Sequence, residues 1–125
     1  MSKVAIIEDD QTISQMYRMK FEAEGFDVGL AENGKTGLEL IKNSKPDIVL
    51  LDLQMPEMSG SEALAKMRAQ PWGKHVPVIV LTNIGREEAP TEVRTLGVHS
   101  YIVKAEATPS QVVSRVKTAL GLDKS

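Results

Sequence analysis

The stretch IVLL, residues 48–51, places four aliphatic residues in a row directly before an acid, Asp52. Strands with one solvated face alternate apolar and polar residues, whereas a continuous run of Val, Ile and Leu is typical of a parallel strand covered on both faces. Four more short apolar runs lie along the chain, at residues 4–7 (VAII), 27–31 (DVGLA), 78–81 (VIVL) and 101–103 (YIV). We therefore predict a buried parallel sheet of five strands.

Amphipathic segments separate and follow these runs. Four apolar residues of the first segment recur at the spacing of one helical face: Ile13, Met16, Tyr17 and Phe21. Helices are predicted near residues 11–24, 35–43, 60–70, 87–96 and 109–120. Pro90 either breaks the fourth of these or marks its true first turn, because proline disrupts a helix interior. The alternation predicts an α/β fold with a doubly wound five-stranded parallel sheet, (βα)5, in one domain of residues 1–125.

The composition argues against several classes of function. The formal net charge of -2 gives no electrostatic reason for binding nucleic acid or an anionic membrane. The chain has no cysteine, so a disulfide framework and a thiolate zinc site are excluded. The first apolar run is too short for a signal peptide, and no stretch approaches the roughly 20 apolar residues that span a bilayer. We expect a cytoplasmic protein with neither nucleic acid nor membrane as a direct partner.

Polar residues directly follow or end four of the five predicted strands. They are Glu8, Asp9 and Asp10 at the first strand, Asp52 at the third, Thr82 at the fourth and Lys104 at the fifth. Ligands of open α/β sheets bind beyond the carboxyl ends of the strands, so we expect these side chains to gather there. Acids gathered in this way repel one another unless a cation compensates them. Mg²⁺ prefers oxygen ligands of this kind.

Asp52 is the residue predicted to react. A carboxylate beside a bound cation can attack phosphorus and form an aspartyl phosphate. The hydroxyl of Thr82 and the ammonium of Lys104 are suited to stabilise the phosphoryl oxygens. Each residue also has a structural explanation, since Asp10 is suited to cap the first helix and a lone Thr or Lys at a strand end is more often structural or solvated. Their joint placement favours a phosphate site.

Around these residues the chain resembles a response-regulator receiver domain of two-component signalling. The resemblance spans nearly all 125 residues and is carried by the segments IIEDD, LLDLQMPEMSG, VIVLTN and YIVK. Its most specific part is the pattern D-x-x-M-P-x-M-x-G from Asp52 to Gly60, at the family's spacing to Thr82 and Lys104. The resemblance implies a flavodoxin-like fold with the strand order 2-1-3-4-5.

The resemblance also implies how a metal and a phosphoryl group are held. Asp52 is implied to be the phosphoacceptor, in a reaction that depends on Mg²⁺, for which Mn²⁺ can substitute. Glu8 and Asp9 are implied to form the acidic pair at the metal, with Asp9 as the direct ligand. The backbone carbonyl of Gln54 is implied to complete this metal site.

On the other side of the site, Thr82 and Lys104 are implied to bind the phosphoryl oxygens. Tyr101 is implied to turn inward as Thr82 moves, which reshapes the face formed by the fourth helix, the fifth strand and the fifth helix. Such a protein is not an enzyme in the usual sense, because it catalyses only its own phosphorylation and dephosphorylation. Its implied partners are a sensor histidine kinase or a histidine phosphotransfer protein, an unidentified output partner and, after phosphorylation, a second copy of itself.

The segment GLAENGKT, Gly29 to Thr36, suggests a different function, because it matches the phosphate-loop pattern G-x-x-x-x-G-K-[ST] of nucleotide hydrolases. A phosphate loop follows a full strand and runs directly into a helix. Gly29 instead lies inside the second apolar run. We therefore predict a turn at residues 33–34 and a solvated Lys35.

Two further classes remain open. Phosphatases of the haloacid dehalogenase type also use an aspartyl nucleophile, but they need a second Asp two residues later, where this chain has Gln54. A binding module that works without phosphorylation is favoured by Ala105, because members of the receiver family usually have Pro after the lysine. Without that Pro, the bond after Lys104 is either trans in a rearranged loop or cis at a cost of about 2.5–4 kcal/mol.

Overall fold

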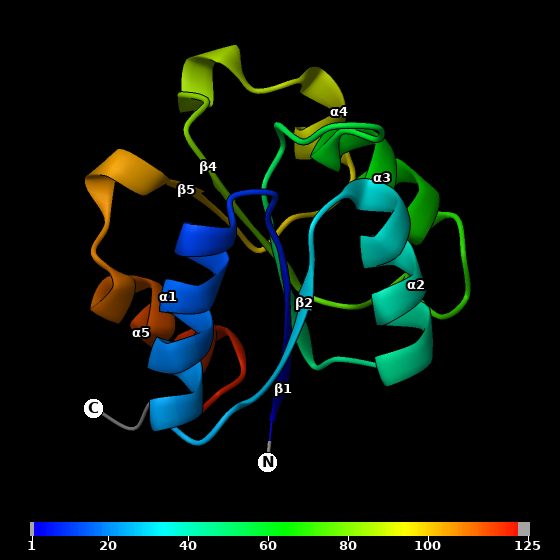
Figure 1. Ribbon diagram of the computed structural model, residues 1–125. Coiled ribbons are helices and arrows are strands. Elements are labelled where there is room, and N and C mark those ends of the chain that lie inside the picture. The colour runs from blue at the N-terminus through cyan, green and yellow to red at the C-terminus, as the bar shows by residue number, and fades with distance from the viewer. Residues whose placement is uncertain (1, 123–125) are drawn as a thin grey trace.

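The computed structural model describes residues 2–122 of the chain. Its sheet is parallel throughout and has the strand order β2-β1-β3-β4-β5 (Figure 1). The strands are β1 (Lys3–Ile7), β2 (Asp27–Ala31), β3 (Ile48–Leu51), β4 (Val78–Thr82) and β5 (Ser100–Val103). The predicted doubly wound fold and its strand order are confirmed. The chain reverses its direction across the sheet between β1 and β3, which makes their carboxyl ends the switch point.

Successive residues of each strand point to opposite sides of the sheet, so both faces carry apolar side chains. Helices cover both of these faces (Figure 1). One face packs against α1 (Gln11–Ala23) and α5 (Pro109–Ala119). The other packs against α2 (Gly34–Ser44), α3 (Gly60–Arg68) and α4 (Thr91–Thr95). The central strands β1, β3 and β4 therefore bury both faces, as their continuous apolar sequences predicted.

The fourth helix differs from its prediction. Residues 87–96 were expected to be helical, but the structure has a short 3-10 turn at Arg86–Glu88 and then a single turn of helix in α4. Pro90 separates the two, and Ala89 before it is extended, with ψ 138°. A residue before proline is pushed out of the helical region, which is why the predicted helix breaks here. The other four helices lie within two residues of their predicted bounds.

Met16 is a second difference, because its side chain is not part of the core. Tyr17 and Phe21 face the sheet from α1, whereas Met16 is 42% exposed and Met19 is 71% exposed. Both methionines line a groove between α1 and the start of α5. Among the helices of residues 2–122, none has both the length and the apolar character that a bilayer crossing requires.

Candidate functional site

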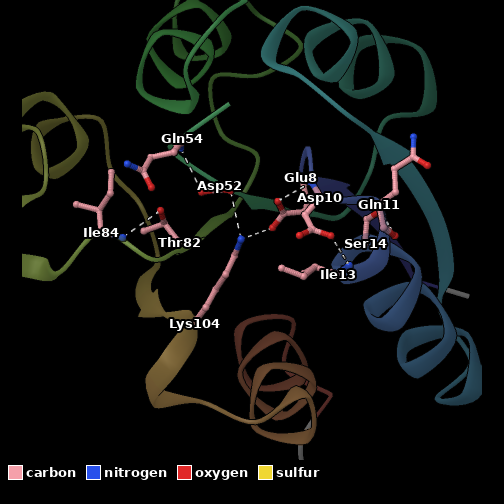
Figure 2. Close-up of polar contacts among 10 residues, drawn as sticks. All are labelled: Glu8, Asp10, Gln11, Ile13, Ser14, Asp52, Gln54, Thr82, Ile84 and Lys104. Carbon is pink, nitrogen blue, oxygen red and sulfur yellow. Dashed lines mark hydrogen bonds and ion pairs between the residues drawn. The ribbon is translucent and has the colours of Figure 1, made fainter. Parts of the chain in front are cut away.

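The polar residues predicted from the strand ends do lie together at the switch point. Figure 2 shows Glu8 from the end of β1, Asp52 from the end of β3 and Lys104 from the end of β5 pointing toward one another. Thr82, the last residue of β4, lies beside them. Residues far apart in the sequence are thus brought to one edge of the sheet.

Lys104 connects the two buried acids of this edge. Its ammonium nitrogen Nζ lies 3.2 Å from Oδ2 of Asp52 and also donates to Oε1 of Glu8. The side chains of Lys104, Glu8 and Asp52 are only 12%, 5% and 6% exposed, respectively. Ion pairs shielded from water in this way are screened little by salt. The pairing of Lys104 with Glu8 was not predicted, since it joins residues 96 positions apart with no local pattern to mark it.

The backbone around Asp52 fixes where its carboxylate points. Its N–H donates to the carbonyl of Ile7 at 3.0 Å, which extends the pairing of β1 and β3 by one residue. Its Oδ1 accepts from the N–H of Gln54 at 3.2 Å. The loop then returns over Asp52, where a Cβ on Gly60 would overlap the Asp52 carbonyl oxygen and lie 2.7 Å from Cα of Leu53. Gly60 is therefore required for this loop to close against the acid.

Three carboxylates at this edge form a group that can hold a cation. One oxygen from each of Glu8, Asp9 and Asp52 lies within 4.8 Å of the others, and Asp9 is the exposed member. Asp10 is not part of this group. Its Oδ1 accepts from the N–H of Ile13 at 3.1 Å and caps α1, so the structural explanation of Asp10 is confirmed.

Burial and the close ion pairs shift two pKa values at this edge. Burial raises the pKa of the Glu8 carboxyl above its ordinary value, and the negative charge of Asp52 adds to this, against the opposing effect of Lys104. Burial alone would lower the pKa of Lys104, but the hydrogen bond that its ammonium donates to Glu8 and the charge of Asp52 together raise it. Lys104 is therefore a cation at neutral pH despite its burial.

Thr82 and Tyr101 are joined through the loop after β4. Thr82 is fully buried, and its hydroxyl oxygen accepts from the N–H of Ile84 at 3.4 Å. The phenol of Tyr101 donates to the carbonyl oxygen of Ile84 at 2.8 Å. Burial is also the main cause of the raised pKa of Tyr101. A displacement of this loop would therefore change the hydrogen bonds of both side chains.

The peptide bond after Lys104 is trans rather than cis, which decides between the two alternatives that the sequence left open. Within residues 2–122 the structure contains no cis peptide bond, and Lys104–Glu106 forms a 3-10 turn. Its closing bond is long, at 3.5 Å from the N–H of Ala107 to the carbonyl oxygen of Lys104. The peptide bond between Lys104 and Ala105 is therefore trans, and the loop forms a 3-10 turn.

The segment Gly29 to Thr36 is not a phosphate loop. Asn33 caps α2 by accepting from the N–H of Thr36 at 2.9 Å, and Lys35 is exposed. An amide of the first turn of α2 is thus bonded to a side chain of the protein itself. A turn at residues 33–34 was predicted, and in the structure Asn33 is the helix cap and Gly34 already the first residue of α2.

Comparison with known sequences gives a clear family match. A model described as the response regulator receiver domain matches residues 4–117. The chain is 33% identical over 118 residues to the phosphate regulon transcriptional regulatory protein PhoB of Rhizobium meliloti, covering 94% of this chain and 52% of that protein. It is 30% identical to the polar-differentiation response regulator DivK of Brucella anthropi, covering 94% of this chain and 95% of that protein. The chain thus spans about half the length of PhoB.

Solved structures agree with this match. A CheY-like response regulator receiver domain protein from Methanospirillum hungatei superposes with a TM-score of 0.88 at 26% identity, over 97% of this chain and 94% of that one. The receiver domain of the sensor histidine kinase PA1611 from Pseudomonas aeruginosa, which has a magnesium ion coordinated in its active site cleft, superposes with a TM-score of 0.86 at 21% identity. That alignment covers 96% of this chain and 98% of that one.

Proposed function

Because this chain belongs to the response regulator receiver domain family, we propose that Asp52 is the residue through which it accepts a phosphoryl group. The observation that carries this proposal is the position of the Asp52 carboxylate at the switch point, buried and within 3.2 Å of the Lys104 ammonium. We extend the proposal to the whole chain, residues 1–125, as one receiver domain. Receiver domains are signalling domains, so the protein is expected to act on its own Asp52 and on no diffusible substrate.

The proposed reaction transfers a phosphoryl group from a phosphohistidine. A carboxylate oxygen of Asp52 forms a bond to phosphorus as the bond between phosphorus and the imidazole nitrogen breaks, and the imidazole leaves with that electron pair. In the transition state, negative charge is spread over the three oxygens of the phosphoryl group that is being transferred. Lys104 and Thr82 would donate to these oxygens, and donors held in place before the reaction stabilise such charge most effectively.

The acidic group is chemically suited to Mg²⁺, with Mn²⁺ as a substitute. Its carboxylate oxygens lie within 4.8 Å of one another, and hard oxygen ligands are those that Mg²⁺ prefers. We propose that Glu8, Asp9 and Asp52 hold the ion together with the backbone carbonyl of Gln54. The bound ion would neutralise charge on the phosphoryl oxygens. The magnesium ion in the active site cleft of the PA1611 receiver domain supports this assignment.

The phosphodonor is proposed to be a histidine kinase or a histidine phosphotransfer protein. Its histidine must come within bonding distance of Asp52, so the donor must cover the rim of the site. α1 and α5 begin close after the strand ends that carry the site, and the exposed Met16 and Met19 in the middle of α1 line a groove together with Pro109 at the start of α5. An exposed apolar groove between α1 and the start of α5 would give the donor a surface to bind.

The output is proposed to depend on Thr82 and Tyr101. A phosphoryl group on Asp52 adds charge and acceptor oxygens, to which the Thr82 hydroxyl would turn. The bonds of Thr82 and Tyr101 to Ile84 would transmit this movement to β5 and the face beside it. A homodimer or an output partner would bind that face, while a cytoplasmic location and the lack of direct nucleic acid binding stay predictions.

The test is phosphorylation by acetyl phosphate with Mg²⁺, followed by intact-mass spectrometry. We expect wild type to gain one phosphoryl group, Asp52→Asn to gain none, and Asp27→Asn, which alters an exposed aspartate on an edge strand, to behave as wild type. Removing Mg²⁺ with a chelator should abolish the gain. Equal phosphorylation of Asp52→Asn and wild type would contradict the proposal.

A further inference from the structure

The segment that carries Lys104 is held from outside by one arginine. Arg86, in the 3-10 turn after β4, uses its two terminal nitrogens on different partners. Nη1 donates to Oε1 of Glu106 at 2.9 Å, and Nη2 donates to the backbone carbonyl of Tyr101 at 3.1 Å. Tyr101 lies three residues before Lys104 and Glu106 lies two residues after it. The guanidinium group thus spans the short segment from which Lys104 projects.

The backbone of Arg86 is itself held by a contact within residues 83–97. Its backbone carbonyl accepts from Nη2 of Arg94 in α4 at 3.1 Å. Two residues earlier, the carbonyl of Ile84 accepts from the phenol of Tyr101. The loop after β4 and the segment after β5 are therefore joined at two points by Tyr101 and Arg86, on the side of the site away from the acids.

The local backbone gives Lys104 little support of its own. The one bond that closes its 3-10 turn is 3.5 Å long. Ala105 follows the lysine, and unlike a proline it leaves φ free to rotate. Lys104 and the two residues that follow it lie past the end of β5, where the sheet no longer pairs them. A side-chain contact therefore has to supply the rigidity that neither the ladder nor the residue type supplies.

We propose that Arg86 is a positioning residue, which holds Lys104 in place by bridging Tyr101 and Glu106. This inference rests on the proposed function, in which Lys104 donates to the phosphoryl oxygens. A planar guanidinium can reach two acceptors in a fixed geometry, whereas a lysine ammonium acts as a single point charge. The pair is exposed, with side chains 53% and 61% accessible, so its effect is modest and sensitive to salt.

The test separates positioning of Lys104 from general stability. Binding of beryllofluoride, an analogue of the phosphoryl group, is measured by calorimetry at saturating Mg²⁺ for wild type, Arg86→Met, Glu106→Gln and the double variant. Binding of Mg²⁺ alone and the thermal midpoint are measured for the same proteins. Arg18→Met is the matched control, because it removes another exposed arginine–glutamate pair, that with Glu22 on α1.

We expect each single variant to bind beryllofluoride about two- to fivefold more weakly, the range of an exposed ion pair. The double variant should be no weaker than Arg86→Met, since the two residues act as one contact. Arg86→Lys should fall between wild type and Arg86→Met because it keeps one contact. Mg²⁺ binding should not change, because the acids directly follow β1 and β3, and the thermal midpoint should fall no further than in Arg18→Met.

Three outcomes would overturn the inference. The first is unchanged beryllofluoride binding in Arg86→Met. The second is a double variant whose loss of beryllofluoride binding is the product of the two single losses. The third is a loss of Mg²⁺ binding or of thermal stability in Arg86→Met that is larger than in Arg18→Met. Failure of the proposed function is distinct, because wild type itself would then not bind beryllofluoride at Asp52.

Discussion

The ends of β1 and β3 differ from the segment after β4, residues 83–97, in what holds them in place. Asp52 directly continues a strand that is buried on both faces, and the backbone pairing of the sheet extends to its own N–H. Residues 83–97 contain only a 3-10 turn and one turn of helix. Val93 packs into the core, and arginine and tyrosine side chains bonded to backbone carbonyls also attach this segment to the rest of the molecule.

The difference shows how a fixed site and a movable surface can share one edge of a sheet. Moving the acids requires disruption of a buried ladder, which opens only with much of the core. A single side-chain hydrogen bond contributes only about 1 kcal/mol net, so the loop at residues 83–89, none of which is buried, can move at small cost, whereas the buried Val93 anchors α4. The acidic site can therefore stay constant while the neighbouring loop responds to what it binds.

The largest effect is expected where the backbone itself holds the acid. Gly60→Ala places a Cβ against the carbonyl of Asp52 and 2.7 Å from Cα of Leu53, and neither backbone group can yield as a flexible side chain would. We expect a loss of about 3 kcal/mol in the free energy of unfolding, the upper end of the usual cost of overpacking. Chemical denaturation followed by circular dichroism measures this loss.

Gly29→Ala is the control for this change. Its Cβ would meet only the end of the Leu40 side chain, at 3.0 Å, which can rotate away. Alanine is also no worse than glycine within a strand, so its stability should stay within about 1 kcal/mol of wild type. If both variants lost the same stability, close packing at Asp52 would not be what holds the loop.

The next effect tests how the far end of residues 83–97 is attached. Arg68 in α3 donates to four backbone carbonyls, those of Gly73, Val76, Leu96 and Gly97, at 2.7–3.1 Å. Arg68→Met keeps much of the side-chain volume but leaves these oxygens without that donor. We expect a loss of about 2–3 kcal/mol in the free energy of unfolding, because bonds from a charged donor count for more than neutral ones.

Arg18→Met provides the comparison, since Arg18 only pairs with Glu22 on the surface of α1, and it should cost less than about 0.5 kcal/mol. Hydrogen exchange gives a second reading of Arg68→Met. Amides of residues 91–97 should lose more protection than those of β3. Uniform loss across the chain would mean that Arg68 supports the whole fold rather than this segment.

The same two regions explain what the sequence could predict. The acids and Thr82 follow continuous apolar runs, and such runs set both the strand and the residue at its end, so Asp52 was placed from its neighbours alone. The fourth helix could not be bounded, because REEAPTEVR has charged residues throughout and a proline whose effect depends on tertiary contacts. Likewise, the contacts of Lys104 with Glu8 and of Arg86 with Glu106 join distant residues and leave no periodic signal.

A smaller change addresses the loop after β4 directly. Tyr101→Phe removes the bond to the Ile84 carbonyl and leaves the ring in place. A bond of this kind contributes about 1 kcal/mol, so opening of the loop should become about fivefold more frequent. Amide exchange at residues 84–89 should rise by that factor, while amides of residues 48–51 keep the wild-type rate. An equal rise in both sets would remove the distinction between the two regions.

The smallest effect concerns the ionisation of the two tyrosines, of which Tyr17 lies on α1 in the core and Tyr101 lies on β5 and bonds to the loop after β4. Burial raises the pKa of Tyr17 and of Tyr101 above the ordinary value, so folding favours the protonated phenol in both. The stabilisation that this gives is complete below pH 10 and is lost as the pH rises through the raised pKa values. Tyr17 is only 3% exposed and faces the sheet from α1, whereas the phenol of Tyr101 bonds to Ile84 in the loop after β4. In an absorbance titration we expect Tyr101 to ionise while the protein is still folded and Tyr17 to ionise only as it unfolds. Tyr101→Phe should therefore remove the first of two steps, and a first step that persists in this variant would mean that the region around Tyr17 opens as readily as the loop.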